Sequence, residues 1–233
     1  MNKDKKRSGK LKRFLFVLLL LIIAFFTYVE IANRNSINMT YRQKLLKAIY
    51  PAWMWWAKLT GTNTKALSNE KATAAVSFYT LKDTLIDGTA FSFETLKGKK
   101  VMLVNTASDC GYTDQYEDLQ KLYEANKDKL VIIGFPANDF KEQEKGDDKA
   151  IAEFCKRNYG VTFMLMSKSS VVKSAHQNKV FQWLTDSTLN GWNNQPPAWN
   201  FCKYIVDEEG RLINYFGSTV EPFNKDIINA ITQ

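Results

Sequence analysis

The longest apolar stretch of the 233-residue chain lies near its N-terminus. Fifteen of the sixteen residues of Phe14–Val29 are apolar or aromatic, and seven basic residues precede them within residues 1–13. A helix of sixteen residues covers about 24 Å at about 1.5 Å per residue, and flanking Lys12, Arg13 and Ile31 extend its reach toward the ~30 Å of a hydrocarbon core. The pattern predicts a transmembrane helix over residues 14–31 after a basic tail at residues 1–13.

A cleaved signal peptide would show the same order of basic and apolar segments. Its cleavage site would require small residues at alternate positions, and Glu30 occupies such a position after the apolar run. We therefore favour an uncleaved signal-anchor. The positive-inside rule then places residues 1–13 in the cytoplasm and the rest of the chain on the periplasmic or extracytoplasmic side of a bacterial-type membrane.

Residues 32–75 have the mixed pattern of a juxtamembrane connector. Tyr41–Leu59 combines basic residues with Trp53, Trp55 and Trp56, which suits a segment at a bilayer interface and equally suits packing of the tryptophans on the following domain. Pro51 is expected to begin or end a helix. The small polar residues from Thr60 to Ala75 predict a flexible spacer.

From Val76 onward, apolar runs of strand length alternate with amphipathic segments of helical period. This order predicts one α/β domain over residues 76–233, with a thioredoxin-like fold in which helices flank a central mixed sheet. The expected strands are 101–105, 130–135, 161–166, 203–206 and 211–216, the last two forming a hairpin, and short strands flank a turn at Thr84–Gly88. The expected helices follow Thr113, begin at Asp147 and Asp148, include 180–184 and end the chain at 223–231.

The formal net charge of +8 is concentrated in the N-terminal tail. Residues 1–13 carry seven bases and one acid, whereas the other 220 residues carry 25 bases and 23 acids. A nearly neutral body argues against a surface that binds nucleic acid.

Three cysteines and one histidine are too few and too scattered for a zinc or haem site. No two of the cysteines, Cys110, Cys155 and Cys202, form a CxxC motif, and His176 is the only histidine. We therefore expect neither a metal nor another cofactor. The odd number of cysteines leaves at least one of them unpaired or redox-active.

Cys110 is the candidate reactive thiol because it lies between a predicted buried strand and the start of a helix. A helix N-terminus stabilises a thiolate over a thiol, Gly111 lets the backbone approach closely, and Thr113 can cap the helix. The alternative is that Cys110 is a small apolar residue of the core.

Residues 76–233 resemble the glutathione peroxidase family over most of their length. Four blocks in the same order carry the resemblance: 96–113 around Cys110, 134–144 from Gly134 to Glu144, 154–163 around Cys155, and Trp199-Asn200-Phe201. The resemblance implies that Cys110 is the peroxidatic cysteine, whose thiolate attacks the O–O bond and becomes a sulfenic acid. It also implies that Trp199 and Asn200 donate hydrogen bonds to the reacting atoms.

The same resemblance gives Cys155 the position of a resolving cysteine, 45 residues after Cys110. A Cys110–Cys155 disulfide would form, and local unfolding would have to bring Cys155 out of its helix. From its own context, Cys155 is equally a residue of an apolar helix face. Cys202 has no such match and is expected to be packed in the core.

Asp139 stands where the family usually has Gln. An ionised Asp139 would raise the pKa of the thiol, whereas a protonated one could donate a proton to the leaving oxygen, so we count Asp139 among the candidate catalytic residues. Met164 also replaces the usual Pro.

The resemblance therefore predicts a thiol peroxidase for hydrogen peroxide or lipid hydroperoxides, recycled by a thioredoxin-like reductant. Glutathione is less favoured as the reductant because no basic cluster suits it. The short interval between Gln177 and Trp199 resembles that of monomeric members. Two alternatives remain: a membrane-tethered redox sensor or relay with weak turnover, and a thiol–disulfide oxidoreductase, which the missing CxxC disfavours.

Overall fold

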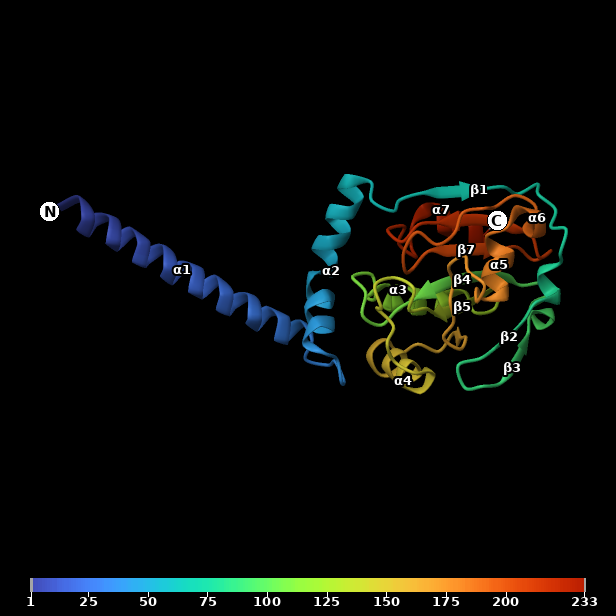
Figure 1. Cartoon of the computed structure of the whole chain (residues 1–233), viewed down its shortest axis with the longest axis horizontal. Coiled ribbons are helices and arrows are strands. Elements are labelled where there is room, and N and C mark those ends of the chain that lie inside the picture. The colour runs from blue at the N-terminus through green and yellow to red at the C-terminus, as the bar shows by residue number, and fades with distance from the viewer. Residues whose placement is uncertain (1, 233) are drawn as a thin grey trace.

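The computed structural model describes residues 2–232, and their side chains from residue 10 onward (Figure 1). A six-stranded sheet has the order β1-β8-β7-β4-β5-β6, with β4, β5 and β6 parallel and the other neighbours antiparallel. Its strands are β1 (Ala66–Ser68), β4 (Lys100–Thr106), β5 (Leu130–Pro136), β6 (Met164–Leu165), β7 (Lys203–Val206) and β8 (Leu212–Phe216). A separate hairpin pairs β2 (Lys82–Thr84) with β3 (Ala90–Ser92).

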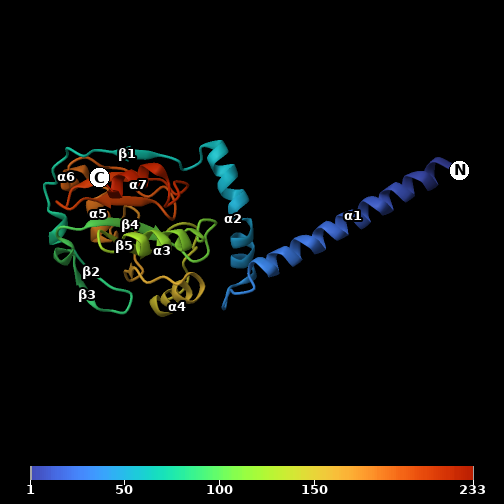
Figure 2. The ribbon, with the colours of Figure 1, turned by 180° about the vertical axis from the view of Figure 1, so that it is seen from behind.

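Helices cover both faces of the sheet, and this explains why every residue of β4 and β5 is buried (Figure 2). Met102 and Val104 of β4 pack on the face covered by α3 (Gln115–Asn126), α4 (Asp148–Tyr159) and α7 (Lys225–Thr232). Val101 and Leu103 pack on the other face, under α5 (Lys179–Leu184), α6 (Ser187–Asn190) and the 3-10 helices η1 (Phe78–Thr80) and η2 (Phe93–Leu96). The predicted thioredoxin-like fold with a central mixed sheet is confirmed.

The third predicted strand, at 161–166, is reduced to the two residues of β6. The backbone N–H of Val161 donates to the Cys155 carbonyl at the end of α4, and that of Thr162 donates to the Gln120 side chain. Because these groups are used by the helix end and by a side chain, pairing with β5 begins only at Met164.

Helix α1 (Asn2–Ala32) contains an apolar segment, Lys10–Ala32, that is long enough to cross a membrane. It points away from the domain (Figure 1). Its large apolar side chains from Leu11 to Leu21 are exposed. Length and apolarity of this kind fit either a membrane span or a signal sequence.

Helix α2 (Tyr41–Thr60) continues through Pro51, so the expectation of a helix end at that residue is wrong. A capping box between Thr40 and Gln43 begins the helix, and Gly61 ends it in the left-handed conformation. Both halves of the helix are also packed: the Ala48 carbonyl, before Pro51, accepts from the Tyr28 hydroxyl of α1, and Met54, after Pro51, is buried on the domain. The caps and this packing offset the hydrogen bond that proline cannot make.

The flexible spacer expected from Thr60 to Ala75 is also wrong. Within it, β1 pairs with β8 through Ala66 and Phe216, which covers an edge of the sheet. The contact continues where the Gly217 N–H donates to the Lys65 carbonyl at 2.8 Å. A Cβ on Gly217 would lie 2.2 Å from the Asn63 carbonyl oxygen, so only glycine allows this approach.

The interpretation that the α2 tryptophans pack on the domain holds for Trp53. The ring of Trp53 contacts Tyr112 of the domain, with centroids 6.3 Å apart. Trp55 and Trp56 remain 67% and 55% exposed. Helix α2 therefore packs on the domain with one face and presents apolar side chains on another.

Candidate active site

Cys110 lies in the loop between β4 and α3. Its backbone N–H donates to Thr113 Oγ1 at 2.9 Å, and the Thr113 hydroxyl donates to the Ala107 carbonyl at 2.8 Å. The Tyr112 N–H points at the Cys110 sulfur, 3.4 Å away. Thr113 therefore holds the Cys110 loop, and the expectation that it caps the helix is wrong because α3 begins two residues later, after Asp114.

Trp199 and Asn200 reach Cys110 from the segment before β7. Asn105 of β4 fixes this segment, since its amide donates to the Trp199 carbonyl at 2.9 Å and its oxygen accepts from the Cys202 N–H at 3.0 Å. Phe201 has a φ of +65°, a costly conformation for a residue with a side chain, and its N–H donates to the Asn105 carbonyl. The backbone is strained at the point where it presents Asn200.

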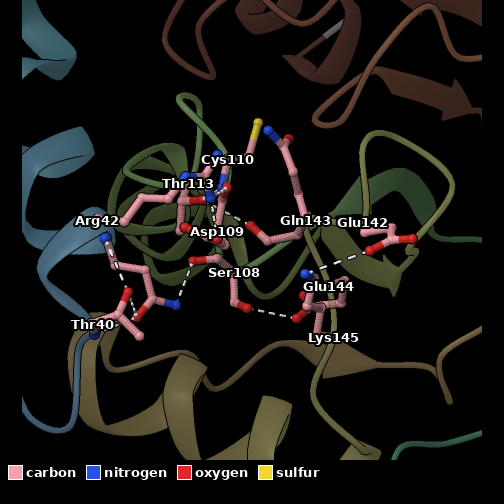
Figure 3. Close-up of polar contacts among 12 residues, drawn as sticks. Thr40, Arg42, Ser108, Asp109, Cys110, Thr113, Glu142, Gln143, Glu144 and Lys145 are labelled. Carbon is pink, nitrogen blue, oxygen red and sulfur yellow. Dashed lines mark hydrogen bonds and ion pairs between the residues drawn. The ribbon is translucent and has the colours of Figure 1, made fainter.

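Helix α2 covers the Cys110 loop from outside, and the sequence did not reveal this. Arg42 donates to the Asp109 carbonyl at 2.9 Å and forms an ion pair with the Asp109 carboxylate (Figure 3). Gln43 donates to the Ser108 carbonyl at 3.1 Å. Under this cover the Cys110 side chain is only 1% exposed.

Burial raises the pKa of the Cys110 thiol above its usual value because it disfavours the thiolate. Hydrogen bonds from the Tyr112 N–H and from the Asn200 and Trp199 side chains oppose this effect, as does the positive charge of Arg42. The thiolate is therefore stabilised mainly by hydrogen-bond donors held around the sulfur. The helix N-terminus that the sequence suggested for this role begins five residues after Cys110.

With this geometry in view, comparisons with known proteins are decisive. A model of the family described as "Glutathione peroxidase" matches residues 78–185. Glutathione peroxidase-like peroxiredoxin GPX5 of Chlamydomonas reinhardtii is 46% identical over 146 residues, which is 62% of this chain and 89% of the relative. Glutathione peroxidase-like peroxiredoxin 2 of Saccharomyces cerevisiae is 42% identical over 64% of this chain and 93% of its own length.

The chain belongs to the glutathione peroxidase family. A solved structure of a protein called Trgpx, in its apo form, superposes with a TM-score of 0.53 at 32% identity, over 69% of this chain and 98% of Trgpx. A DsbF homologue from Corynebacterium diphtheriae shares the fold, with a TM-score of 0.51 at 18% identity over 73% of this chain and 93% of its own. Family membership makes the protein an oxidoreductase, a peroxidase that uses a thiol.

In this family member, Gln143 and not Asp139 lies beside the Cys110 site. The Asn200 amide donates to the Gln143 side-chain oxygen at 3.0 Å, and the Cys110 sulfur and the Gln143 amide point in the same direction in Figure 3. The Asp139 carboxylate instead accepts hydrogen bonds from Ser170 and Val171, at 2.8 and 2.7 Å. The expectation that Asp139 would face the thiol is therefore wrong.

Sequence analysis gave Gln143 no role, although Gln143 lies in one of the matching blocks. The two residues before it, Lys141 and Glu142, both have a φ of +52°. Two consecutive left-handed residues turn the chain sharply, and this turn separates Gln143 from Asp139 in space. Neither residue is glycine or asparagine, so the sequence carried no signal for the turn.

Glu144 lies next to the Cys110 loop and is fully buried. It accepts a hydrogen bond of 2.6 Å from the Ser108 hydroxyl, and its second oxygen has no partner among the described residues. Burial raises the pKa of Glu144 from its usual 4.5 to about 7, with a further contribution from the negative charge of Asp109. Sequence analysis gave Glu144 no role, although it ends one of the matching blocks.

Cys155 is buried inside α4, and burial raises its pKa to about 12. The neighbouring Tyr116 side chain opposes this rise. Cys202 packs against Tyr215 and Ser218 in the core cluster on the other face of the sheet. All three thiols are free, and residues 2–232 contain no cluster of side chains that could hold a metal ion.

Proposed function

We propose that this peroxidase reduces hydrogen peroxide or lipid hydroperoxides through Cys110, and that a Cys110–Cys155 disulfide is then reduced by a thioredoxin-like dithiol. The Cys110 thiolate attacks one oxygen of ROOH, the O–O bond breaks, and a sulfenic acid forms. The departing RO⁻ takes a proton and leaves as ROH, which is water when the substrate is hydrogen peroxide.

Cys155 completes the cycle in this proposal. Its thiol displaces the hydroxyl of the sulfenic acid, so that a disulfide forms and water leaves. A reduced thioredoxin-like protein then exchanges its dithiol for this disulfide and restores both thiols. The sum is ROOH plus a dithiol giving ROH, water and a disulfide. Because Cys155 is buried in the middle of α4, disulfide formation requires that helix to unfold locally.

We assign Trp199 and Asn200 as the donors that stabilise charge on the reacting sulfur and oxygen. Both side chains lower the pKa of the Cys110 thiol, and Asn105 and the strained Phe201 hold them in place. Donors fixed before the reaction lose little free energy to reorganisation when charge shifts in the transition state. Gln143 joins them through its contact with Asn200. Asp139 takes no part in this proposal.

We further propose that α1 anchors the protein as a monomer in a membrane. Residues 1–13 would then be a cytoplasmic tail, residues 14–31 the single membrane span, residues 32–75 a juxtamembrane segment and residues 76–233 the extracytoplasmic peroxidase domain. The basic tail supports this orientation, and the exposed Trp55 and Trp56 suit the polar surface of a bilayer. Protease protection of the two ends in membrane vesicles tests the orientation.

The observation that carries the proposal is the buried Cys110 thiol, at whose sulfur the Tyr112 N–H points from 3.4 Å and whose pKa the Asn200 and Trp199 side chains lower. The test is peroxide consumption by the full-length protein in detergent, with thioredoxin and its reductase, and with glutathione in a parallel assay. Sustained turnover that is lost in Cys110→Ser and Cys155→Ser, and kept in the control Cys202→Ser, is the expected result.

Other outcomes divide the proposal into its parts. Turnover that survives Cys155→Ser removes Cys155 from the mechanism. Oxidation of one equivalent without turnover under either reductant would instead support a redox relay. Faster turnover with glutathione than with thioredoxin would overturn the assignment of the reductant.

A further inference from the structure

A cavity of about 290 Å³ lies between helix α2 and the Cys110 loop. Trp199 and Gln143 form its wall on the side of the site, together with Gly111 of the Cys110 loop. The opposite wall is α2, which contributes Leu46, Ile49 and Trp53. The cavity therefore connects the residues around the reacting sulfur with a segment that lies outside the 78–185 match to the family.

The α2 wall is an apolar stripe with helical spacing. Leu46, Ile49 and Trp53 are separated by three and four residues, so they lie on one side of the helix. Arg42 is the one charged residue among the described residues that line the cavity, and its guanidinium is already paired with Asp109. A hydrocarbon chain entering here would meet apolar surface and would not need to displace an unpaired charge.

Contacts at both ends of α2 hold this wall against the domain. Gln43 is bonded to Ser108 near the start of the helix, and Lys58 forms a 2.6 Å ion pair with Glu221 near its end. Between them, Met54 is buried in the core cluster that contains Cys110. The chain then returns to the sheet as β1, so the wall is tied to the domain on either side (Figure 2).

We propose that this cavity binds the hydrocarbon chain of an alkyl or lipid hydroperoxide, with Leu46, Ile49 and Trp53 as the residues that determine specificity. The proposal rests on the peroxidase function proposed above and adds the place where the hydrocarbon chain of the substrate would bind. Its volume is at the lower end of those of small-molecule sites, which suits part of a chain beside the reacting O–O group. Hydrogen peroxide has no chain and gains nothing from the wall.

The test is a series of straight-chain hydroperoxides that stay dissolved in water, namely hydrogen peroxide and its ethyl, butyl and hexyl derivatives. For the full-length protein in detergent, we expect kcat/KM to rise with chain length, at least about tenfold from ethyl to hexyl, because each buried methylene adds to binding. Trp53→Ala is expected to reduce that rise to less than about threefold, while kcat/KM for hydrogen peroxide changes less than twofold.

Two further variants separate binding in the cavity from general damage. Trp55→Ala removes a tryptophan of the same helix that does not line the cavity, and should leave the whole series unchanged. Ile49→Trp adds volume inside the cavity, and should lower kcat/KM for hexyl hydroperoxide while sparing hydrogen peroxide.

Three results would overturn the proposal. One is the absence of a chain-length dependence in the parent, and another is an equal loss for all four substrates in Trp53→Ala. The third is a higher KM for thioredoxin in Trp53→Ala with an unchanged chain-length dependence, because the cavity would then receive the reductant. A parent without Cys110-dependent turnover of hydrogen peroxide is a separate outcome, which refutes the proposed function.

Discussion

Cys110 and Cys155 are both buried thiols, but their surroundings differ in kind. Cys110 lies in a loop, where the Tyr112 N–H points at its sulfur and the Asn200 and Trp199 side chains lower its pKa. Cys155 lies inside a helix, beside the side chain of Tyr116 in the same core cluster. Burial raises the pKa of both thiols, but the donors around Cys110 oppose that effect from several directions.

This difference indicates how one fold can give two thiols separate tasks. Fixed donors stabilise the Cys110 thiolate where it lies. For Cys155, a pKa raised to about 12 and a position within α4 mean that it becomes reactive only when the helix opens. The first thiol is controlled by electrostatics and the second by local stability.

The largest expected effect follows from removing the donors on the Cys110 side. We expect the double variant Trp199→Phe with Asn200→Ala to lower kcat/KM for hydrogen peroxide about a thousandfold, since a single donor of this kind contributes a factor of about 100 to 1,000. Alkylation of Cys110 should also shift to higher pH, because both side chains lower its pKa. Stopped-flow peroxide reduction and a pH series of alkylation rates measure the two effects.

Trp192→Phe is the matched control, because that indole donates to the Leu212 carbonyl at 2.6 Å and not to Cys110. A loss of less than tenfold in the double variant would show that these donors do not control Cys110, and the contrast between the two thiols would fail.

The sequence predicted the centre of the fold well and the segment between α1 and the domain poorly. The strands β4 and β5 are uniformly apolar runs between helical patterns, so burial on both faces could be read directly. Strand β1 has only three residues and pairs with β8 about 150 positions later, which leaves no local signal. In α2, apolar residues and bases suit a lipid surface and a protein surface equally, and only the fold shows which side chains face the domain.

At the site, too, the sequence revealed residues with a local signal or a family motif and missed those brought in from distant positions. The turn between a strand and a helix identified Cys110, and the family motif identified Trp199 and Asn200. Arg42 contacts the Cys110 loop from 67 residues away, and nothing in the sequence pairs them. Gln143, and not Asp139, lies at the site because two left-handed residues between them turn the chain. The residue types at that turn gave no signal for it.

Glu144 belongs to both regions, since it bonds to Ser108 on the Cys110 side and its negative charge raises the pKa of Cys155. Its pKa of about 7 in the folded protein, against 4.5, means that the folded state holds this proton more tightly. Its contribution to stability is complete below pH 4.5 and is lost as the pH rises through about 7. The difference corresponds to about 3 kcal/mol.

Glu144→Gln keeps an acceptor for Ser108 and removes the titration. We therefore expect the stability of the variant, relative to the parent, to increase by about 3 kcal/mol between pH 4.5 and pH 8. Chemical denaturation of the detergent-solubilised proteins across this range measures it. A relative stability that does not change with pH would mean that folding does not raise the pKa of Glu144.

The smallest expected effect tests the claim that local stability controls Cys155. Asp147 caps α4 by accepting the Ala150 N–H at 2.8 Å, and replacing such a cap by alanine costs about 1 kcal/mol. If α4 must open before Cys155 can react, Asp147→Ala should speed disulfide formation about fivefold after one equivalent of peroxide, while the first step at Cys110 keeps its rate.

Asp186→Ala removes an equivalent cap from α6, where the side chain accepts the Thr188 N–H at 2.9 Å, and so controls for a general loss of stability. Stopped-flow fluorescence with acid quenching and mass analysis separates the two steps. Equal acceleration in both variants would attribute the effect to global loosening, and an unchanged rate in Asp147→Ala would mean that Cys155 reaches Cys110 without opening of the first turn of α4.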